Sequence, residues 1–340
     1  MRIRFFDSLR GIWAILIFLC HWTLLFGYNT RMTHGGGYGV AGFLILSGYL
    51  IVLKHGNEFE NINLKTLLLF VYKRMKDIYL LYILSMFPFA VCDLPKVISY
   101  LSVGNKAWQN YVIKYACNIA LLQSIIPGVG SVNGVGWYLS CIFFVYLVSP
   151  FLYKINYIIL KKRLTFWVGI GLCFLAASLL CRYESMYGNP LMRIFQFEIG
   201  MLLAGKGSQA EIIKYKLWKI GLWCGVFLSI ASFWADISSI NMLITNISVA
   251  LLVICGAKQQ NVCAVIPMIS NRVFEGMGKY SGAFYLIHYP VISILGGWLV
   301  QTLWDETKKA AILYGVILFG ISILLSIIYT KSWEKIKRKV

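Results

Sequence analysis

Acidic residues are scarce in this sequence, and so are charged residues of every kind. Asp and Glu together number 13 among 340 residues, against 32 Lys and Arg, and charged residues make up 13% of the chain. Soluble domains carry about 25% charged residues, so the composition argues against a soluble globular protein. No polar stretch is long enough to form a separate soluble domain.

Patterns for metal binding and for disulfide frameworks are also missing. The chain has four histidines and nine cysteines, no CxxC pair, and most cysteines lie in apolar segments. This distribution predicts neither a metal site nor a disulfide framework, although a single pair between Cys92 and Cys117 stays open. GGGYGVAG satisfies GxGxxG, but it lies between two apolar segments without a preceding strand, which excludes the dinucleotide-binding interpretation.

Apolar residues are what the sequence has in abundance. They make up 59% of the chain, and the mean hydropathy is +0.72. Segments long enough to cross a hydrocarbon layer of about 30 Å recur along the whole length. They predict spans at 11–28, 38–54, 78–92, 137–160, 164–181, 190–205, 217–234, 239–256, 280–300 and 311–330. We therefore expect an all-α integral membrane protein whose residues 1–340 form one bundle of about ten transmembrane helices, with 111–126 as an interfacial or re-entrant helix.

The placement of positive charge tests this topology independently. Lys and Arg concentrate in the cytoplasmic loops of membrane proteins, and most of the 32 fall on one side if the N-terminus is inside. Both termini are therefore predicted to be cytoplasmic. Basic clusters such as KKR at 161–163 would face anionic lipid headgroups. This accounts for the net charge of +19, so the expected partner of the basic residues is membrane lipid and not nucleic acid.

The first apolar segment carries an unusual pair of polar side chains. Arg10 and His21 are eleven residues apart, which is about three helical turns, so they share one helix face with Asp7. The rise of about 16 Å places Arg10 at the membrane boundary and His21 near the middle. An ionisable group at that depth is a functional hypothesis by default; the structural alternatives are a helix-packing hydrogen bond for His21 and a boundary anchor for Arg10. His34 and His55 are expected in loops.

Five motifs occur in order along nearly the whole chain. They are FFDSLRGIWAILIFLCH from Phe5, GVAGFLILSGYLI from Gly39, YKRMKDIYLLY from Tyr72, WYLSCIFFVYLVSP from Trp137 and YSGAFYLIHYPVI from Tyr280. Together they resemble the membrane-bound acyltransferase family 3, whose first helix carries an Arg, ten residues and a His. The sequence departs from the family at Ala41, Ile142 and Phe143, where many members have acidic residues, so it resembles a divergent branch.

The resemblance implies transfer of an acyl group, usually acetyl from acetyl-CoA, to a hydroxyl group. The acceptor would be a surface polysaccharide, a lipid-linked sugar or another small molecule, and the protein would lie in the cytoplasmic (inner) membrane of a bacterium. Coenzyme A is polyanionic and cytosolic, so its site should be basic and inward-facing. The cofactor-binding candidates are Arg10, Lys73, Arg74 and Lys76.

His21 is the candidate catalytic residue, either as the general base that deprotonates the acceptor hydroxyl or as a covalent acyl relay. Arg10 would orient the donor or the helix, with Asp7 as its ion-pair partner. The acceptor-binding candidates are Trp137, Tyr138, Ser140, Tyr285 and His288. No metal is expected, and the oligomeric state stays open. Two other classes remain, a transporter or flippase for a lipid-linked sugar and a non-catalytic module.

Overall fold

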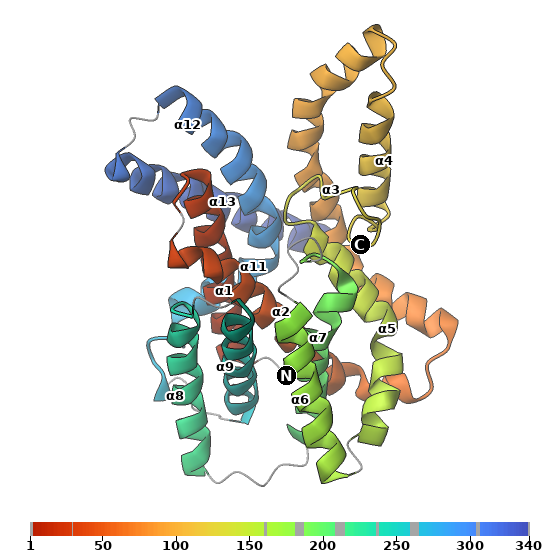
Figure 1. The fold of residues 1–340 in the computed structure, drawn as a ribbon, viewed down its shortest axis with the longest axis vertical. Helices are drawn as coiled ribbons and strands as arrows, with labels where there is room; N and C mark the ends of the chain where they lie inside the picture. The colour runs from red at the N-terminus through yellow and green to blue at the C-terminus, as the bar shows by residue number, and fades with distance from the viewer. Residues whose placement is uncertain are drawn as a thin grey trace.

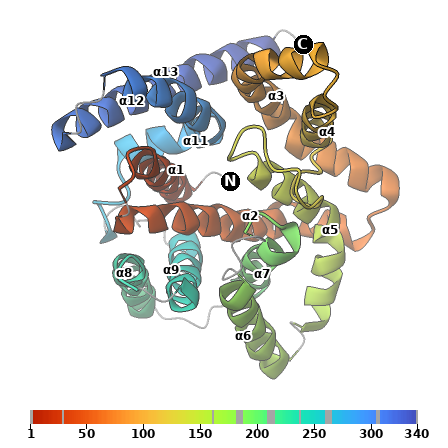
Figure 2. The same cartoon turned by 45° about the horizontal axis from the view of Figure 1, so that its top comes forward.

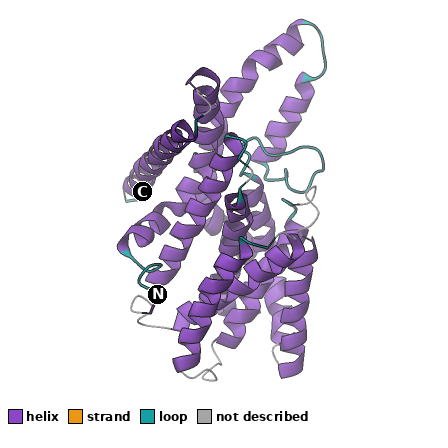
Figure 3. Ribbon diagram, turned by 60° about the vertical axis from the view of Figure 1, so that its left-hand side comes forward, coloured by secondary structure: helices purple, strands orange, loops and turns teal. Residues whose placement is uncertain are grey.

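The computed structural model describes residues 3–28, 30–159, 162–180, 187–207, 215–235, 238–258, 265–303 and 307–338. These residues form helices and loops, with no strand among them (Figure 3). The α-helices are α1 (Arg4–Leu25), α2 (His34–Glu60), α3 (Leu64–Ser102), α4 (Trp108–Ile119), α5 (Trp137–Ile159), α6 (Arg163–Leu180), α7 (Pro190–Gly207), α8 (Tyr215–Ser232), α9 (Ser238–Lys258), α11 (Arg272–Pro290), α12 (Gly297–Leu303) and α13 (Lys308–Lys337). A 3₁₀ turn η1 (Arg31–Thr33) precedes α2, and a π-helical segment η3 (Val291–Gly296) joins α11 to α12.

Seven helical segments are long and apolar enough to cross a membrane. They are Arg4–Leu25, Arg31–Glu60, Leu64–Ser102, Trp137–Ile159, Ser238–Ala257, Arg272–Thr302 and Lys308–Lys337. Leu164–Leu180 and Leu217–Ser232 are apolar but shorter. The expected all-α class is therefore confirmed for the described residues, with seven candidate membrane spans, and each of the ten predicted segments overlaps a described helix.

Helix boundaries differ most at α3, which is predicted from residue 78 and begins at Leu64. Asn63 starts it with a capping box: the Asn63 side chain accepts a hydrogen bond from the Thr66 amide (2.9 Å), and the Thr66 hydroxyl accepts one from the Asn63 amide (3.0 Å). A prediction based on apolar residues ends a span at the first charged residues. The helix itself continues beyond them, because a capping box can start it among polar residues. The basic stretch of α3 is thus helical.

Two further expectations, one about histidines in loops and one about the bounds of a helix, are corrected by the structure. His34 is the first residue of α2, and His55 lies in its last two turns, so neither is in a loop. Helix 111–126 is replaced by the shorter α4, which ends at Ile119. Cys92 and Cys117 are free thiols.

Helix α1 lies at the centre of the bundle, against α2 and α11 (Figures 1 and 2). On the far side of α2, α7 and α9 pack against it, while α13 covers α11. Helices α3 and α4 form a hairpin that projects at the top of Figure 1. The arrangement places the polar face of α1 next to α11.

The contact between α1 and α11 is close because both helices present glycine to it. Gly11 faces the backbone of Phe274 and Gly278, and Gly278 in turn faces the backbone of Asp7. Small residues let membrane helices approach each other in this way. Since Asp7 and Gly278 lie near the starts of their helices while His21 and His288 meet near the ends, the two helices run parallel.

Candidate active site

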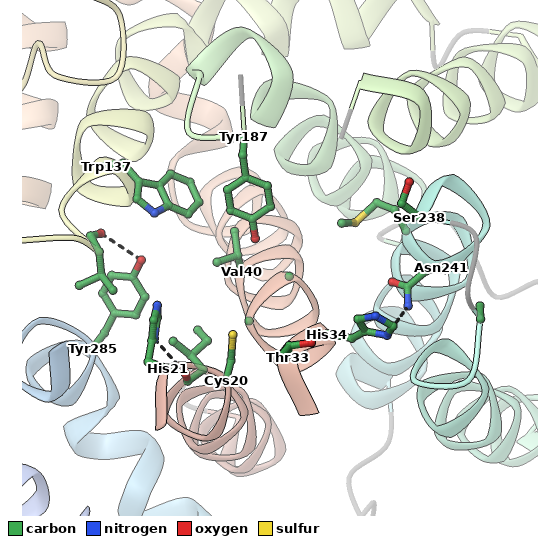
Figure 4. A pocket seen from close by; sticks show the side chains of 16 residues that line it. Cys20, His21, Thr33, His34, Val40, Trp137, Tyr187, Ser238, Asn241 and Tyr285 are labelled. Atoms are coloured by element: carbon green, nitrogen blue, oxygen red, sulfur yellow. Dashed lines mark hydrogen bonds between the residues drawn. The ribbon is translucent and has the colours of Figure 1, made fainter. Parts of the chain in front are cut away.

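His21 lies near the C-terminal end of α1 with one ring nitrogen held and the other facing a cavity. Its Nδ1 is 3.0 Å from the carbonyl oxygen of Ile17 and 3.1 Å from Nε2 of His288. The ring of Tyr289 packs edge-on against it, at 5.3 Å between centroids. Nε2 is directed into a cavity of about 550 Å³, which we call the histidine cavity (Figure 4).

One wall of the histidine cavity is aromatic. It is formed by Trp137 at the start of α5, by Tyr187 and by Tyr285 of α11 (Figure 4). Trp137 and Tyr187 meet edge to face, with ring centroids 5.2 Å apart. The Arg193 guanidinium, fully buried, lies 3.9 Å from the ring centroid of Tyr187 and donates from Nε to the Tyr187 carbonyl (2.8 Å). This cation–π contact fixes the wall from behind.

The opposite wall is polar. The Asn241 side chain donates to Nδ1 of His34 (3.2 Å), and Thr33 and Ser238 lie beside them (Figure 4). Sequence reasoning missed His34 because it follows a short 3₁₀ turn, which gave no periodicity to follow. The cavity thus joins an imidazole, amide and hydroxyl groups, and flat aromatic rings.

Buried hydrogen bonds hold the loop between α4 and α5, whose Val135 lines the histidine cavity. Fully buried Asn118 accepts from the Val132 amide (3.0 Å), and fully buried Asn133 donates to Ser85 and to the Leu286 carbonyl (2.9 Å each). The Tyr285 hydroxyl donates to the Val135 carbonyl (3.1 Å). These bonds fix the loop to α3 and α11.

A second, basic cavity of about 330 Å³ lies toward the start of α1, and we call it the arginine cavity. Arg10, Arg74 and Lys279 line it. Arg10 is paired with the buried carboxylate of Asp7 and donates from Nε to the Phe6 carbonyl (3.3 Å). Lys279 in turn pairs with Glu334 (3.6 Å). Among the described residues no carboxylate pairs with Arg74, so a polyanion would find unmet positive charge there.

Tyr285 lines both cavities and therefore separates them. Its ring lies 5.2 Å from that of Tyr138 and 6.4 Å from that of Phe43, between centroids. Of the two cavities, Tyr138 and Phe43 line the arginine cavity and not the histidine cavity. Three aromatic rings thus stand between the cations and His21.

The structure brings together some of the candidate residues and places others apart. Arg10, Arg74 and Tyr138 line the arginine cavity, and His21, Trp137 and Tyr285 line the histidine cavity. Asp7 pairs with Arg10 but lines neither cavity. The four remaining candidates, Lys73, Lys76, Ser140 and His288, also line neither.

Each of these four has a simple structural setting. Lys73 and Lys76 are exposed on α3. Ser140 is fully buried and donates to the Leu121 carbonyl (2.6 Å), and His288 is fully buried behind His21. Lys279 was not predicted, since its motif offered only an isolated lysine before a tyrosine.

Within the described residues, no three His, Cys, Asp or Glu side chains are grouped so as to hold a metal ion. The positions that are acidic in many family members are apolar here: Ala41 is fully buried, and Ile142 lines the arginine cavity. The group that this arrangement offers for proton transfer is an imidazole.

Comparison with known proteins identifies the same relationship over almost the whole chain. Residues 3–331 match the family described as an acyltransferase domain. The acyltransferase MdmB of Streptomyces mycarofaciens is 22% identical over 369 aligned positions, which cover 94% of this chain and 88% of that protein. No solved structure gives a significant match.

Proposed function

Since this chain belongs to acyltransferase family 3, we propose that it transfers an acetyl group from acetyl-CoA to a hydroxyl of a surface polysaccharide or lipid-linked sugar. The observation that supports this assignment is the position of His21, whose free ring nitrogen opens into a cavity that shares the lining residue Tyr285 with a basic cavity. The two cavities fit a charged donor and a neutral acceptor.

The arginine cavity is the proposed donor site. Coenzyme A carries phosphate groups, and guanidinium groups bind phosphate with a planar pair of donors. Arg10 and Arg74 supply two guanidinium groups and Lys279 an ammonium group. Lys73 and Lys76 remain proposed as an outer ring that attracts the polyanion, because both are exposed on the same helix as Arg74.

The histidine cavity is the proposed acceptor site. Flat aromatic rings pack against the apolar faces of sugar rings, and amide and hydroxyl groups bind their hydroxyls. Trp137 and Tyr285 provide the first kind of surface. Asn241, Thr33 and Ser238 provide the second. A hydrated sugar would lie between these walls with one hydroxyl at His21.

In the proposed reaction His21 acts as a general base. Nε2 takes the proton of the acceptor hydroxyl as its oxygen attacks the thioester carbonyl carbon. The carbon–sulfur bond then breaks, the coenzyme A thiolate leaves, and it takes the proton from the imidazolium. A covalent acyl-histidine intermediate is the alternative for the same residue, and Asp7 keeps Arg10 oriented in either case.

We also propose that the protein lies in the cytoplasmic membrane of a bacterium with ten spans and both termini inside. In this topology α6, α7 and α8 cross the membrane together with the seven longer segments. The arginine cavity then faces the cytoplasm, where acetyl-CoA is found, and the histidine cavity faces outward.

The proposal is tested with membranes that contain wild-type protein, His21→Ala or His55→Ala at equal abundance. His55 lies outside both cavities, bonded to Glu58 (3.0 Å), and serves as the control. Acetyl-CoA labelled in its acetyl group is supplied and label is followed into glycans. Transfer by wild type and His55→Ala but not by His21→Ala is expected; equal transfer by all three would refute the role of His21.

Absence of transfer by the wild type would be followed by measuring acetyl-CoA binding directly. Binding that is lost in Arg74→Ala would locate the donor site without an acceptor. No binding to the wild type would refute the donor assignment and favour the transporter alternative.

A further inference from the structure

His288 is fully buried and contacts the proposed catalytic histidine. Its Nε2 lies 3.1 Å from Nδ1 of His21, and its Nδ1 lies 3.0 Å from the carbonyl oxygen of Phe284. Its ring stacks on that of Phe284, with 11° between the planes and 5.6 Å between centroids. Burial and stacking on Phe284 therefore hold the His288 ring in one orientation.

The backbone determines where the protons of both rings lie. A carbonyl oxygen only accepts hydrogen bonds, and the Nδ1 atoms of His21 and His288 face the carbonyls of Ile17 and Phe284. Each Nδ1 therefore carries the hydrogen. A neutral imidazole has one N–H, so the Nε2 atom of each ring has a lone pair.

The contact between the two histidines then has a direction. Nε2 of His288 accepts, and Nδ1–H of His21 donates to it as well as to the Ile17 carbonyl. In the Nε2–H tautomer of His21, the Nδ1 lone pair would face two acceptors, the Ile17 carbonyl and Nε2 of His288. Neither acceptor would then receive a hydrogen bond from His21. The pair of acceptors thus favours the tautomer whose Nε2 is free to take a proton.

We infer that His288 is a positioning residue that holds His21 in its Nδ1–H tautomer and accepts the hydrogen bond that strengthens when His21 becomes an imidazolium. The inference rests on the proposed role of His21 as a general base. A hydrogen bond from a charged donor is about twice as strong as one between neutral groups, so the contact stabilises the protonated base formed during the reaction. His288 itself does not touch the acceptor.

Two substitutions distinguish positioning from mere packing. In His288→Gln the side-chain carbonyl oxygen reaches the place of Nε2 and accepts in its stead, whereas His288→Leu fills the space without an acceptor. We expect His288→Leu to lower kcat by about 10- to 100-fold, as for residues that orient metal-binding histidines, and His288→Gln to retain most of it. The Michaelis constants for donor and acceptor should change little.

A spectroscopic measurement separates this inference from the proposed reaction. The chain has four histidines, so nitrogen-15 spectra of histidine-labelled protein in membranes can be assigned with one variant per residue. We expect the Nδ1–H tautomer at His21 in wild type, in His288→Gln and in the control His55→Gln, with the Nε2–H tautomer increasing in His288→Leu. This holds whether or not acyl transfer is observed.

The inference is wrong if the His21 tautomer is the same in His288→Leu as in wild type. It is also wrong if His288→Gln and His288→Leu lose activity equally while both remain folded, because packing alone would then account for the loss. Failure of the wild type to transfer acetyl, with the tautomer shift intact, would instead refute the proposed function.

Discussion

The glycine contact between α1 and α11 offers a sharp test of the structure. An alanine Cβ at residue 278 would lie 2.5 Å from the carbonyl carbon of Asp7 and closer still to its oxygen. Carbon atoms in contact prefer about 3.5–4.0 Å, so Gly278→Ala requires the helices to separate by about 1.0–1.5 Å. The same change at Gly276, two residues earlier on α11, meets no heavy atom within 4 Å.

The separation has two energetic consequences. Overpacking costs about 1–3 kcal/mol. If α11 moves as one body, the 3.1 Å contact between His21 and His288 lengthens beyond hydrogen-bond range, which costs about 0.5–1.5 kcal/mol. We expect Gly278→Ala to lower the free energy of unfolding by about 1.5–4.5 kcal/mol on these two effects. Gly276→Ala should be neutral or slightly stabilising, since alanine favours helix by up to about 1 kcal/mol.

The assay compares thermal unfolding of the two variants and wild type in one detergent, together with acetyl transfer in membranes. Gly278→Ala should unfold at lower temperature and lose transfer, while Gly276→Ala behaves as wild type. Equal unfolding temperatures for the two variants, with transfer intact in both, would show that α1 and α11 do not approach at Gly278.

Three further changes test the cavities and the loop. Arg74→Ala should raise the KM for acetyl-CoA by about tenfold, the equivalent of about 1.4 kcal/mol, with kcat retained; Lys65→Ala, exposed at the start of the same helix, should leave steady-state kinetics unchanged. Trp137→Ala should raise the KM for the acceptor without changing the KM for acetyl-CoA, whereas Trp167→Ala, at an exposed position, should change neither. Asn133→Leu removes three buried hydrogen bonds and should destabilise the protein by about 1–3 kcal/mol, measured as a lower unfolding temperature in detergent.

The sequence predicts the helical segments well because apolar length and helix formation coincide inside a membrane. In the hydrocarbon layer a helix satisfies its own backbone groups, so segments such as 190–205 and 239–256 closely anticipate α7 and α9. At membrane boundaries this link fails. α3 continues through Lys73 and Lys76 because its capping and hydrogen bonds, not its hydropathy, determine where it begins.

The candidate site was only partly predictable for a related reason. Arg10 and His21 lie on one helix, so periodicity alone places them on one face. The contact of His21 with His288 joins residues 267 positions apart, and the position of His34 depends on a turn. Helix periodicity gives no distance between separate helices, and a single sequence offers no other source for it.

The parallel course of α1 and α11 explains why both helices contribute to both cavities. Arg10 and Lys279 lie at the starts of these helices and line the arginine cavity, whereas His21 and His288 meet about three turns further along. At about 1.5 Å per residue, the eleven residues from Arg10 to His21 span about 16 Å. Under the proposed function this distance must be bridged by the pantetheine arm of the donor.

Tyr285 lies between those two levels and lines both cavities. Its hydroxyl is fixed to the Val135 carbonyl at 3.1 Å, so the wall between the cavities is held by one side chain and the loop between α4 and α5. Under the proposed function, a thioester bound at the cations passes this ring on its way to His21. An acceptor in the histidine cavity would contact the same ring from the other side, so Tyr285 is the residue through which the two proposed sites meet.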